Sequence, residues 1–176
     1  MKTFSIFITL LFTTASFCQH KIDPVQKSIF DKKHEIKLGA VKLIAGEILE
    51  VTYEYINSKN FSFGSSVLVN FDNESGYSEN FSLTPFARMY FQESKEYGAK
   101  GFFVEGFLKY ISGKDYYYGN STNYSTGSYG LSLGKKWINS SGFVFETLIG
   151  FGRNTTKAVN VPEASFRGDL FIGYRF

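Results

Sequence analysis

The most constraining feature of the chain is an alternation of apolar and polar residues with period two, which begins near residue 34 and continues to the C-terminus. A strand directs successive side chains to opposite faces, so this pattern indicates β-strands with two different faces. We predict eight strands, which cover 34–45, 47–57, 61–71, 81–91, 101–111, 128–138, 142–153 and 165–176. The alternation loses phase near Ala40, which indicates an irregularity such as a bulge in the first strand.

The two faces of these strands differ in composition. From the second strand to the eighth, one face is largely apolar, and its only charged residue is Lys135, which lies near a strand end two residues from Trp137. The other face combines Ser, Thr, Asn and Gly with charged residues, which are Glu50, Glu54, Arg88, Glu105, Lys109, Lys136, Glu146, Arg167, Asp169 and Arg175. Five of these are acidic and five are basic, so the charges cancel, as an enclosed interior requires.

Two architectures suit such strands. A soluble barrel or sandwich points its apolar face inward, whereas an outer-membrane barrel points it at lipid and encloses the charged face. Aromatic residues gather at both ends of the apolar stripes, as in the interfacial girdles of membrane barrels. A soluble calyx would have to hold about 20 large side chains, too many for an open ligand cavity. We therefore predict an all-β fold, an eight-stranded antiparallel up-and-down transmembrane β-barrel over 34–176, in the outer membrane of a Gram-negative bacterium.

The N-terminal segment has the features of an export signal. Lys2 precedes an apolar stretch over 4–12, and Ser16 and Cys18 fit the small-residue positions before a cleavage site. We predict a signal peptide over 1–18 and a polar periplasmic lead-in over 19–33. The alternative is a lipid-modified Cys18, which would require a small residue where the chain has Phe17.

The predicted connections are of two kinds. Links 58–60 and 139–141 are short, whereas 72–80, 112–127 and 154–164 are long and polar, as expected for periplasmic turns and surface loops. The long link 92–100 and the short bend near Gly46 do not fit this scheme. The loop over 112–127 contains Tyr116, Tyr117, Tyr118 and Tyr124 among Ser, Asn and Gly. These tyrosines form either a recognition surface or an extension of the outer aromatic girdle.

Candidate catalytic and metal-ligating residues are scarce. His34 is the one candidate base for a lipid-modifying hydrolase, and a solvated strand end is the simpler interpretation. Asp72, Glu74 and Glu79 could bind a divalent cation that bridges lipopolysaccharide, although an ordinary solvated loop is the simpler interpretation. Glycines at 130, 134, 150 and 152 face inward, where they leave room for long side chains. We predict no catalytic residue, no cofactor and no metal.

The charged inner face has two interpretations. Pairing Phe91 with Phe102 places Arg88 opposite Glu105, and pairing Phe143 with Phe176 places Arg175 opposite Val144 and diagonal to Glu146. Eight strands leave an interior that side chains just fill. The charges therefore indicate a neutral plug of salt bridges, and the alternative is a gated polar path.

Several segments carry a resemblance, namely SFCQ, IKLGAVKLIAG, LEVTYEYINSKNFSFG, SLTPFARMYF and GDLFIGYRF. They resemble a family of small outer-membrane β-barrel proteins, many of unknown function. The resemblance implies an eight-stranded barrel whose terminal Phe176 helps the barrel-assembly machinery recognise the chain; it implies no catalytic residues.

We expect a monomeric, non-enzymatic envelope protein with a structural role or a role in displaying surface loops. Its expected partners are outer-membrane lipid, lipopolysaccharide and the barrel-assembly machinery. The alternatives are an outer-membrane lipid-modifying enzyme and a narrow channel for small polar solutes. A net charge of +3 gives no indication of nucleic-acid binding.

Overall fold

The computed structural model describes residues 31–71, 77–91, 98–117, 120–156 and 161–176. The predicted signal peptide over 1–18 and most of the predicted lead-in over 19–33 lie outside these residues. The strands are β1 His34–Gly39, β2 Ile48–Ile56, β3 Phe61–Asn70, β4 Glu79–Tyr90, β5 Gly101–Tyr117, β6 Asn120–Ile138, β7 Phe143–Asn154 and β8 Ala164–Arg175, with the helix α2 Ala40–Gly46 between β1 and β2. No helix in these ranges is long and apolar enough to cross a membrane.

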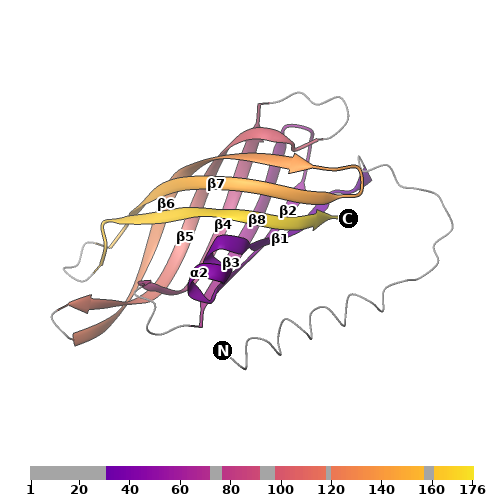
Figure 1. Cartoon of the computed structure of the whole chain (residues 1–176). Coiled ribbons are helices and arrows are strands. Elements are labelled where there is room, and N and C mark those ends of the chain that lie inside the picture. The colour runs from indigo at the N-terminus through magenta and orange to yellow at the C-terminus, as the bar shows by residue number, and fades with distance from the viewer. Residues whose placement is uncertain (1–30, 72–76, 92–97, 118–119, 157–160) are drawn as a thin grey trace.

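The eight strands close into a barrel. Each strand pairs in antiparallel orientation with its neighbours in sequence, and β1 pairs with β8 (Figure 1). This confirms the predicted closed antiparallel barrel of eight strands. Because the strand number is even, His34 and Phe176 lie at one end, which we call the terminal end; there they exchange backbone hydrogen bonds of 3.2 and 2.8 Å. The opposite end, which carries α2 and the β5–β6 hairpin, is the loop end.

The first strand is shorter than predicted. Its pairing with β8 ends at Gly39, opposite Phe171, and residues 40–46 form α2 instead of continuing the strand to 45. The helix ends where Glu47 adopts a left-handed conformation with φ 52°. Its sequence, AVKLIAG, is rich in strong helix formers. At the loop end α2 contacts both β2 and β8, in the place that a longer β1 would have occupied.

The fifth and sixth strands are longer than predicted. They pair with each other as far as Tyr117 and Asn120, whereas their pairing with β4 and β7 ends at Gly113 and Ser128. The segment predicted as a loop over 112–127 is therefore largely a two-stranded ribbon that extends beyond the rest of the barrel (Figure 1). The prediction was wrong because Thr and Tyr, despite their polar groups, are favourable in paired strands.

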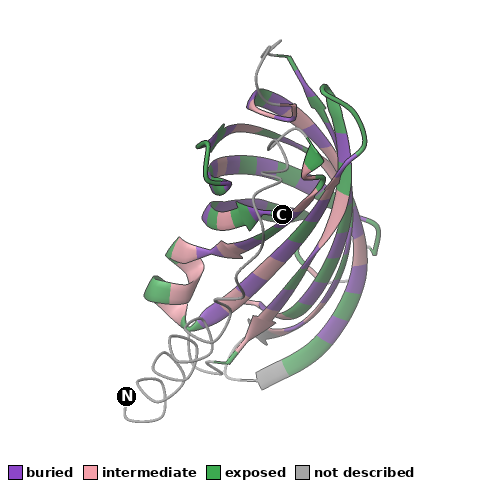
Figure 2. Ribbon diagram, turned by 90° about the vertical axis from the view of Figure 1, so that its right-hand side faces the viewer, coloured by how far each residue is buried: buried purple, intermediate pink, exposed green. Residues whose placement is uncertain are grey.

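Buried and exposed residues alternate along the strands (Figure 2). The outer face exposes large apolar side chains, including 67% of Leu131 and 64% of Phe151, whereas Glu54, Glu105 and Lys136 inside the barrel are fully buried. In soluble proteins charged side chains are the ones least often buried. The barrel therefore has the inverse distribution, with an apolar exterior and a charged interior.

Candidate functional site

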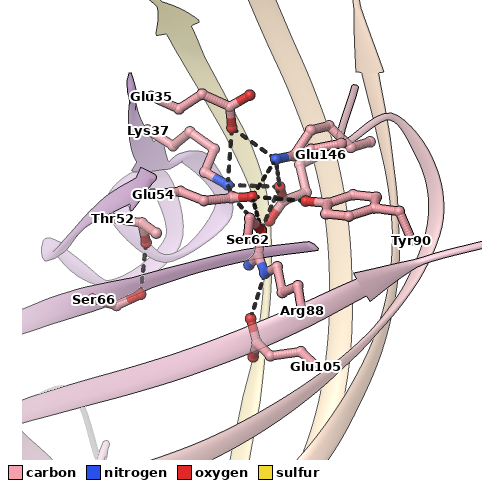
Figure 3. Close-up of polar contacts among 12 residues, drawn as sticks. Glu35, Lys37, Thr52, Glu54, Ser62, Ser66, Arg88, Tyr90, Glu105 and Glu146 are labelled. Atoms are coloured by element: carbon pink, nitrogen blue, oxygen red, sulfur yellow. Dashed lines mark hydrogen bonds and ion pairs between the residues drawn. The ribbon is translucent and has the colours of Figure 1, made fainter. Parts of the chain in front are cut away.

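The interior holds a continuous set of ion pairs, which we call the lumen network (Figure 3). Its members are Glu35, Lys37, Lys42, Glu50, Glu54, Arg88, Glu105, Lys136, Glu146, Arg167 and Arg175. Lys42 comes from α2, and every strand except β3 contributes a charge. Strand β3 contributes the hydroxyls of Ser62 and Ser66. Five carboxylates thus meet six cations, and opposite charges nearly balance.

Glu54 is the centre of this network. Five donors reach its carboxylate, from Lys37 and Arg88 on Oε2 and from Ser62, Tyr90 and Lys136 on Oε1. The donor–acceptor distances run from 2.5 to 2.8 Å. One buried carboxylate is therefore shared by three buried cations, each of which also pairs with a second carboxylate, and a buried charge is tolerated only when it is paired.

Arg88 joins Glu54, at the centre of the network, to Glu105 and Glu146. Its Nε donates to Glu105 at 2.7 Å, and its Nη1 donates to Glu54 at 2.7 Å and to Glu146 at 2.9 Å. Arg88 and Glu105 are direct cross-strand partners, in the register expected from the sequence. The guanidinium carbon also lies 4.3 and 4.5 Å from the ring centroids of Phe86 and Phe103. Ring faces attract a cation, so these side chains hold Arg88 in place.

The network continues toward the loop end through Arg167. Its Nε donates to Glu105 at 2.7 Å and its Nη1 donates to Glu50 at 3.1 Å. Glu50 also pairs with Lys42 of α2 at 2.5 Å. Lys109, which the sequence also placed inside, forms a separate pair with Glu79 at 2.6 Å and donates to a backbone oxygen of β8. Ion pairs therefore occupy the lumen along much of its length.

Asp169 differs from the other predicted interior charges. Its carboxylate accepts backbone N–H groups of Val41 at 2.9 Å, Lys42 at 3.4 Å and Leu170 at 2.7 Å. The first N–H groups of a helix have no partner within the helix, and a negative charge there is favourable. Asp169 therefore caps α2 from β8, rather than bridging to a cationic side chain.

Arg175 has different partners from those predicted. Phe143 pairs with Tyr174 rather than Phe176, so the predicted register is wrong by two residues and the diagonal contact with Glu146 is absent. The reason is the closure of the barrel. Phe176 pairs with His34 of β1, so the C-terminus extends past Phe143, the first residue of β7. The Arg175 guanidinium binds Glu35 and the backbone oxygens of residues 98 and 99.

Sequence reasoning missed Lys42 of α2 and three polar residues of the strands that contact the network. Glu35 and Lys37 are fully buried on β1 and pair with the network, and the Tyr90 hydroxyl donates to Glu54. The alternation in HEIKLG, which sets Glu35 and Lys37 on one face, was the available signal. Because the alternation is lost near Ala40, directly after this segment, the two faces of the first strand were not assigned.

The interior also contains aromatic rings, which the predicted Ser, Thr, Asn and Gly lining did not include. Phe86, Phe103 and Phe107 are buried there. A Cβ added at Gly130 would lie 2.6 Å from Cζ of Phe107, and one added at Gly134 would collide with the Phe103 ring. The inward glycines of β6 therefore leave room for rings.

His34 lies in an aromatic cluster at the terminal end. Its Nδ1 is 2.7 Å from the Tyr53 hydroxyl, and its ring centroid is 5.3 Å from that of Tyr55 and 5.9 Å from that of Phe176. Its hydrogen-bond partner is thus a phenol rather than a serine nucleophile. This arrangement suits a structural element of the aromatic girdle.

The predicted loop sites are only partly described. Asp72, Glu74 and Tyr118 lie outside the described residues, while Glu79 belongs to β4. Across the described part of the chain, no group of three or more His, Cys, Asp or Glu residues could hold a metal ion. Tyr116 and Tyr117 lie in β5. Tyr124 is 9% exposed and its hydroxyl donates to the backbone oxygen of Ser78 at 3.4 Å, so it does not belong to an exposed recognition surface.

The barrel has the same fold as a protein of known structure. It matches the N-terminal β-barrel domain of Pseudomonas aeruginosa OprF with a TM-score of 0.58 and 11% sequence identity, over 82% of this chain and 96% of that chain. No protein-family model matches the chain, and neither does any curated protein. The likeness at this identity establishes a shared eight-stranded barrel fold.

Proposed function

We propose that the chain is an integral outer-membrane β-barrel protein of a Gram-negative bacterium, with a filled lumen and a structural role. The observation that carries this proposal is the inverted burial pattern, in which Leu131 and Phe151 are exposed while Glu54 and Lys136 are fully buried. Such an exterior is stable against lipid, and a closed barrel leaves no sheet edge with unsatisfied backbone groups there.

The outward-facing Lys135 supports the same environment. Its Nζ lies 4.6 Å from the ring centroid of Phe102 and 5.1 Å from that of Trp137. Long cationic side chains near a membrane interface extend their charge toward water, and aromatic rings gather at the same level. The short turns that precede β3 and β7 then face the periplasm, and α2 and the β5–β6 hairpin face the exterior.

A filled lumen favours a structural role over transport. Solutes would have to displace ion pairs such as Arg88–Glu105 and Lys136–Glu35, whose side chains are fully buried. Eight-stranded barrels have interiors that side chains can fill completely. Within the described residues the hydrogen-bond partner of the His34 ring is the Tyr53 hydroxyl, and this pairing favours a non-enzymatic role over lipid modification.

Display of a surface element is a second role that one observation favours. The β5–β6 ribbon continues to Tyr117 and Asn120, well past the last pairings of these strands with β4 and β7. In the proposed orientation this ribbon extends from the outer surface. Its Tyr, Ser, Asn and Gly composition is typical of surfaces that recognise other molecules.

Reconstitution of the purified protein tests this proposal. We expect insertion into phospholipid vesicles, a gel mobility that changes on boiling, and no steady current in planar bilayers. Persistent single-channel current would overturn the filled-lumen part of the proposal. Failure to insert into any bilayer, with the protein soluble without detergent, would overturn the membrane assignment. A triple variant, Glu54→Ala, Arg88→Ala and Lys136→Ala, which empties the centre of the network, serves as the conductance control.

A further inference from the structure

The outer face contains a groove of about 820 Å³ over β4, β5, β6 and β7. At its floor Ala87 on β4 and Gly106 on β5 are direct cross-strand partners. Leu108, Leu131 and Phe151 line its sides, and each exposes more than 60% of its surface. Two small residues side by side therefore form the floor of the groove between large apolar side chains.

The packing of the protein does not explain the glycine at this position. A Cβ added at Gly106 would have one neighbour, Cδ2 of Leu131 at 4.0 Å. At Gly130 the added Cβ would collide with the backbone and with the Phe107 ring, so that glycine is needed inside the protein. Glycine weakens a strand interior, and one use for it is the close approach of a ligand. The space beside Gly106 opens outward, where such a ligand would lie.

The groove ends at a cation. Leu108, Tyr129 and Arg153 are successive cross-strand neighbours on β5, β6 and β7, and all three line the groove. Arg153 is exposed and stands one residue before the end of β7, at the loop end. Within the described part of the chain its guanidinium makes no ion pair, whereas the interior arginines are all paired. The exterior therefore presents an apolar groove with an available guanidinium at one end.

We propose that this groove binds a phosphorylated, acylated lipid of the outer leaflet, for which lipid A is the probe. The phosphate binds Arg153, and one acyl chain lies over Ala87 and Gly106. A guanidinium matches phosphate geometry and binds it with strong, charge-assisted hydrogen bonds. Tyr129 beside it offers an apolar ring and a polar hydroxyl, the combination that suits an interface. This inference rests on the proposed function, because it requires the outer face to lie in lipid.

Another groove on the outer face of the described barrel lacks this combination. It measures about 470 Å³ and is lined by residues of α2, β6, β7 and β8, including Val41 and Leu170. The cation at its edge is Lys42, which is already paired with Glu50 at 2.5 Å. Charge complementarity to a phosphate therefore selects the groove that ends at Arg153.

Native mass spectrometry of the full protein in detergent tests the proposal. We expect the wild type to retain one lipid A molecule, and Arg153→Gln and Gly106→Leu each to weaken this binding about tenfold or more. Lys135→Gln, which removes an outward cation from the terminal end, should leave lipid A binding unchanged. Dephosphorylated lipid A should bind wild type as weakly as lipid A binds Arg153→Gln.

Equal lipid A binding by the wild type, Arg153→Gln and Gly106→Leu would overturn the inference. Equal binding of lipid A and its dephosphorylated form would overturn the assignment of the phosphate to Arg153. Ala87→Leu, which also fills the groove floor, provides a second test should Gly106→Leu fold poorly. Vesicle insertion of the same samples separates the two proposals: insertion without selective lipid retention refutes this inference alone, and failure of the wild type to insert refutes the proposed function.

Discussion

Replacing Glu54 by Gln tests whether the lumen network stabilises the barrel. The substitution keeps the shape of the side chain but removes the charge that Lys37, Arg88 and Lys136 share. The network changes from five carboxylates and six cations to four and six. In addition, the new amide nitrogen cannot accept the hydrogen bonds that one carboxylate oxygen of Glu54 accepts.

The expected loss of unfolding free energy follows from the partners that remain. Removing one member of a buried ion pair costs about 3–5 kcal/mol, because it leaves an uncompensated charge. Each cation here keeps another carboxylate at 2.7 Å: Lys37 keeps Glu146, Arg88 keeps Glu105, and Lys136 keeps Glu35. The effect should therefore lie at the lower end, at about 3 kcal/mol.

Urea unfolding in phospholipid vesicles measures this loss. The chain has one tryptophan, Trp137, which is 39% exposed on the outer face, so its fluorescence reports on the transfer of the barrel from lipid to water. The matched control is Glu163→Gln, the same change at an exposed residue, with an expected effect below about 0.5 kcal/mol. Adding Arg88→Met to Glu54→Gln leaves four carboxylates and five cations, the same excess of one cation as in the wild type. The double variant should therefore be about 1 kcal/mol more stable than the sum of the two single losses predicts.

Two results would refute this reasoning. If Glu54→Gln and Glu163→Gln unfold at the same urea concentration, the charge of Glu54 gives the barrel no more stability than a neutral side chain would. If the double variant loses as much unfolding free energy as the two single variants together, the stability of the barrel does not depend on charge balance within the network.

Three further changes test other parts of the structure. Asp169→Ala removes the acceptor at the start of α2, so we expect a loss of about 1 kcal/mol and faster proteolysis within 40–47; wild-type proteolysis rates would contradict the capping role. Deleting Phe176 removes two backbone hydrogen bonds to His34 and should lower the fraction of protein with heat-modifiable gel mobility, and an unchanged fraction would count against its part in closure. Replacing 115–122 with a short Gly-Ser turn should leave the urea midpoint unchanged, because the described pairings of this part of the ribbon join β5 to β6 and lie beyond the last pairing with β4 at Gly113; a clear drop would show that the ribbon stabilises the barrel.

The division of residues between the two faces could be predicted from the sequence. Side chains alternate along any strand, so Glu105 and Lys109 share a face wherever the strand is placed. The cross-strand partners Arg88 and Glu105 could also be predicted, because Phe91 and Phe102 mark the ends of two well-defined strands. The prediction was wrong by two residues for Arg175, because the pairing of β1 with β8 sets the position of the last strand.

The contacts that make up the network could not be predicted in this way. Lys37 reaches Glu146 and Arg167 reaches Glu50 across the lumen, between strands that are not neighbours. The helix α2 depends on Asp169, which lies 128 positions after Val41 in the chain. Periodicity reports only the direction of each side chain along its own strand, which is a local property of the backbone. The tertiary structure decided which inward charges meet and where β1 gives way to a helix, because both depend on how the barrel closes and on distances across its interior.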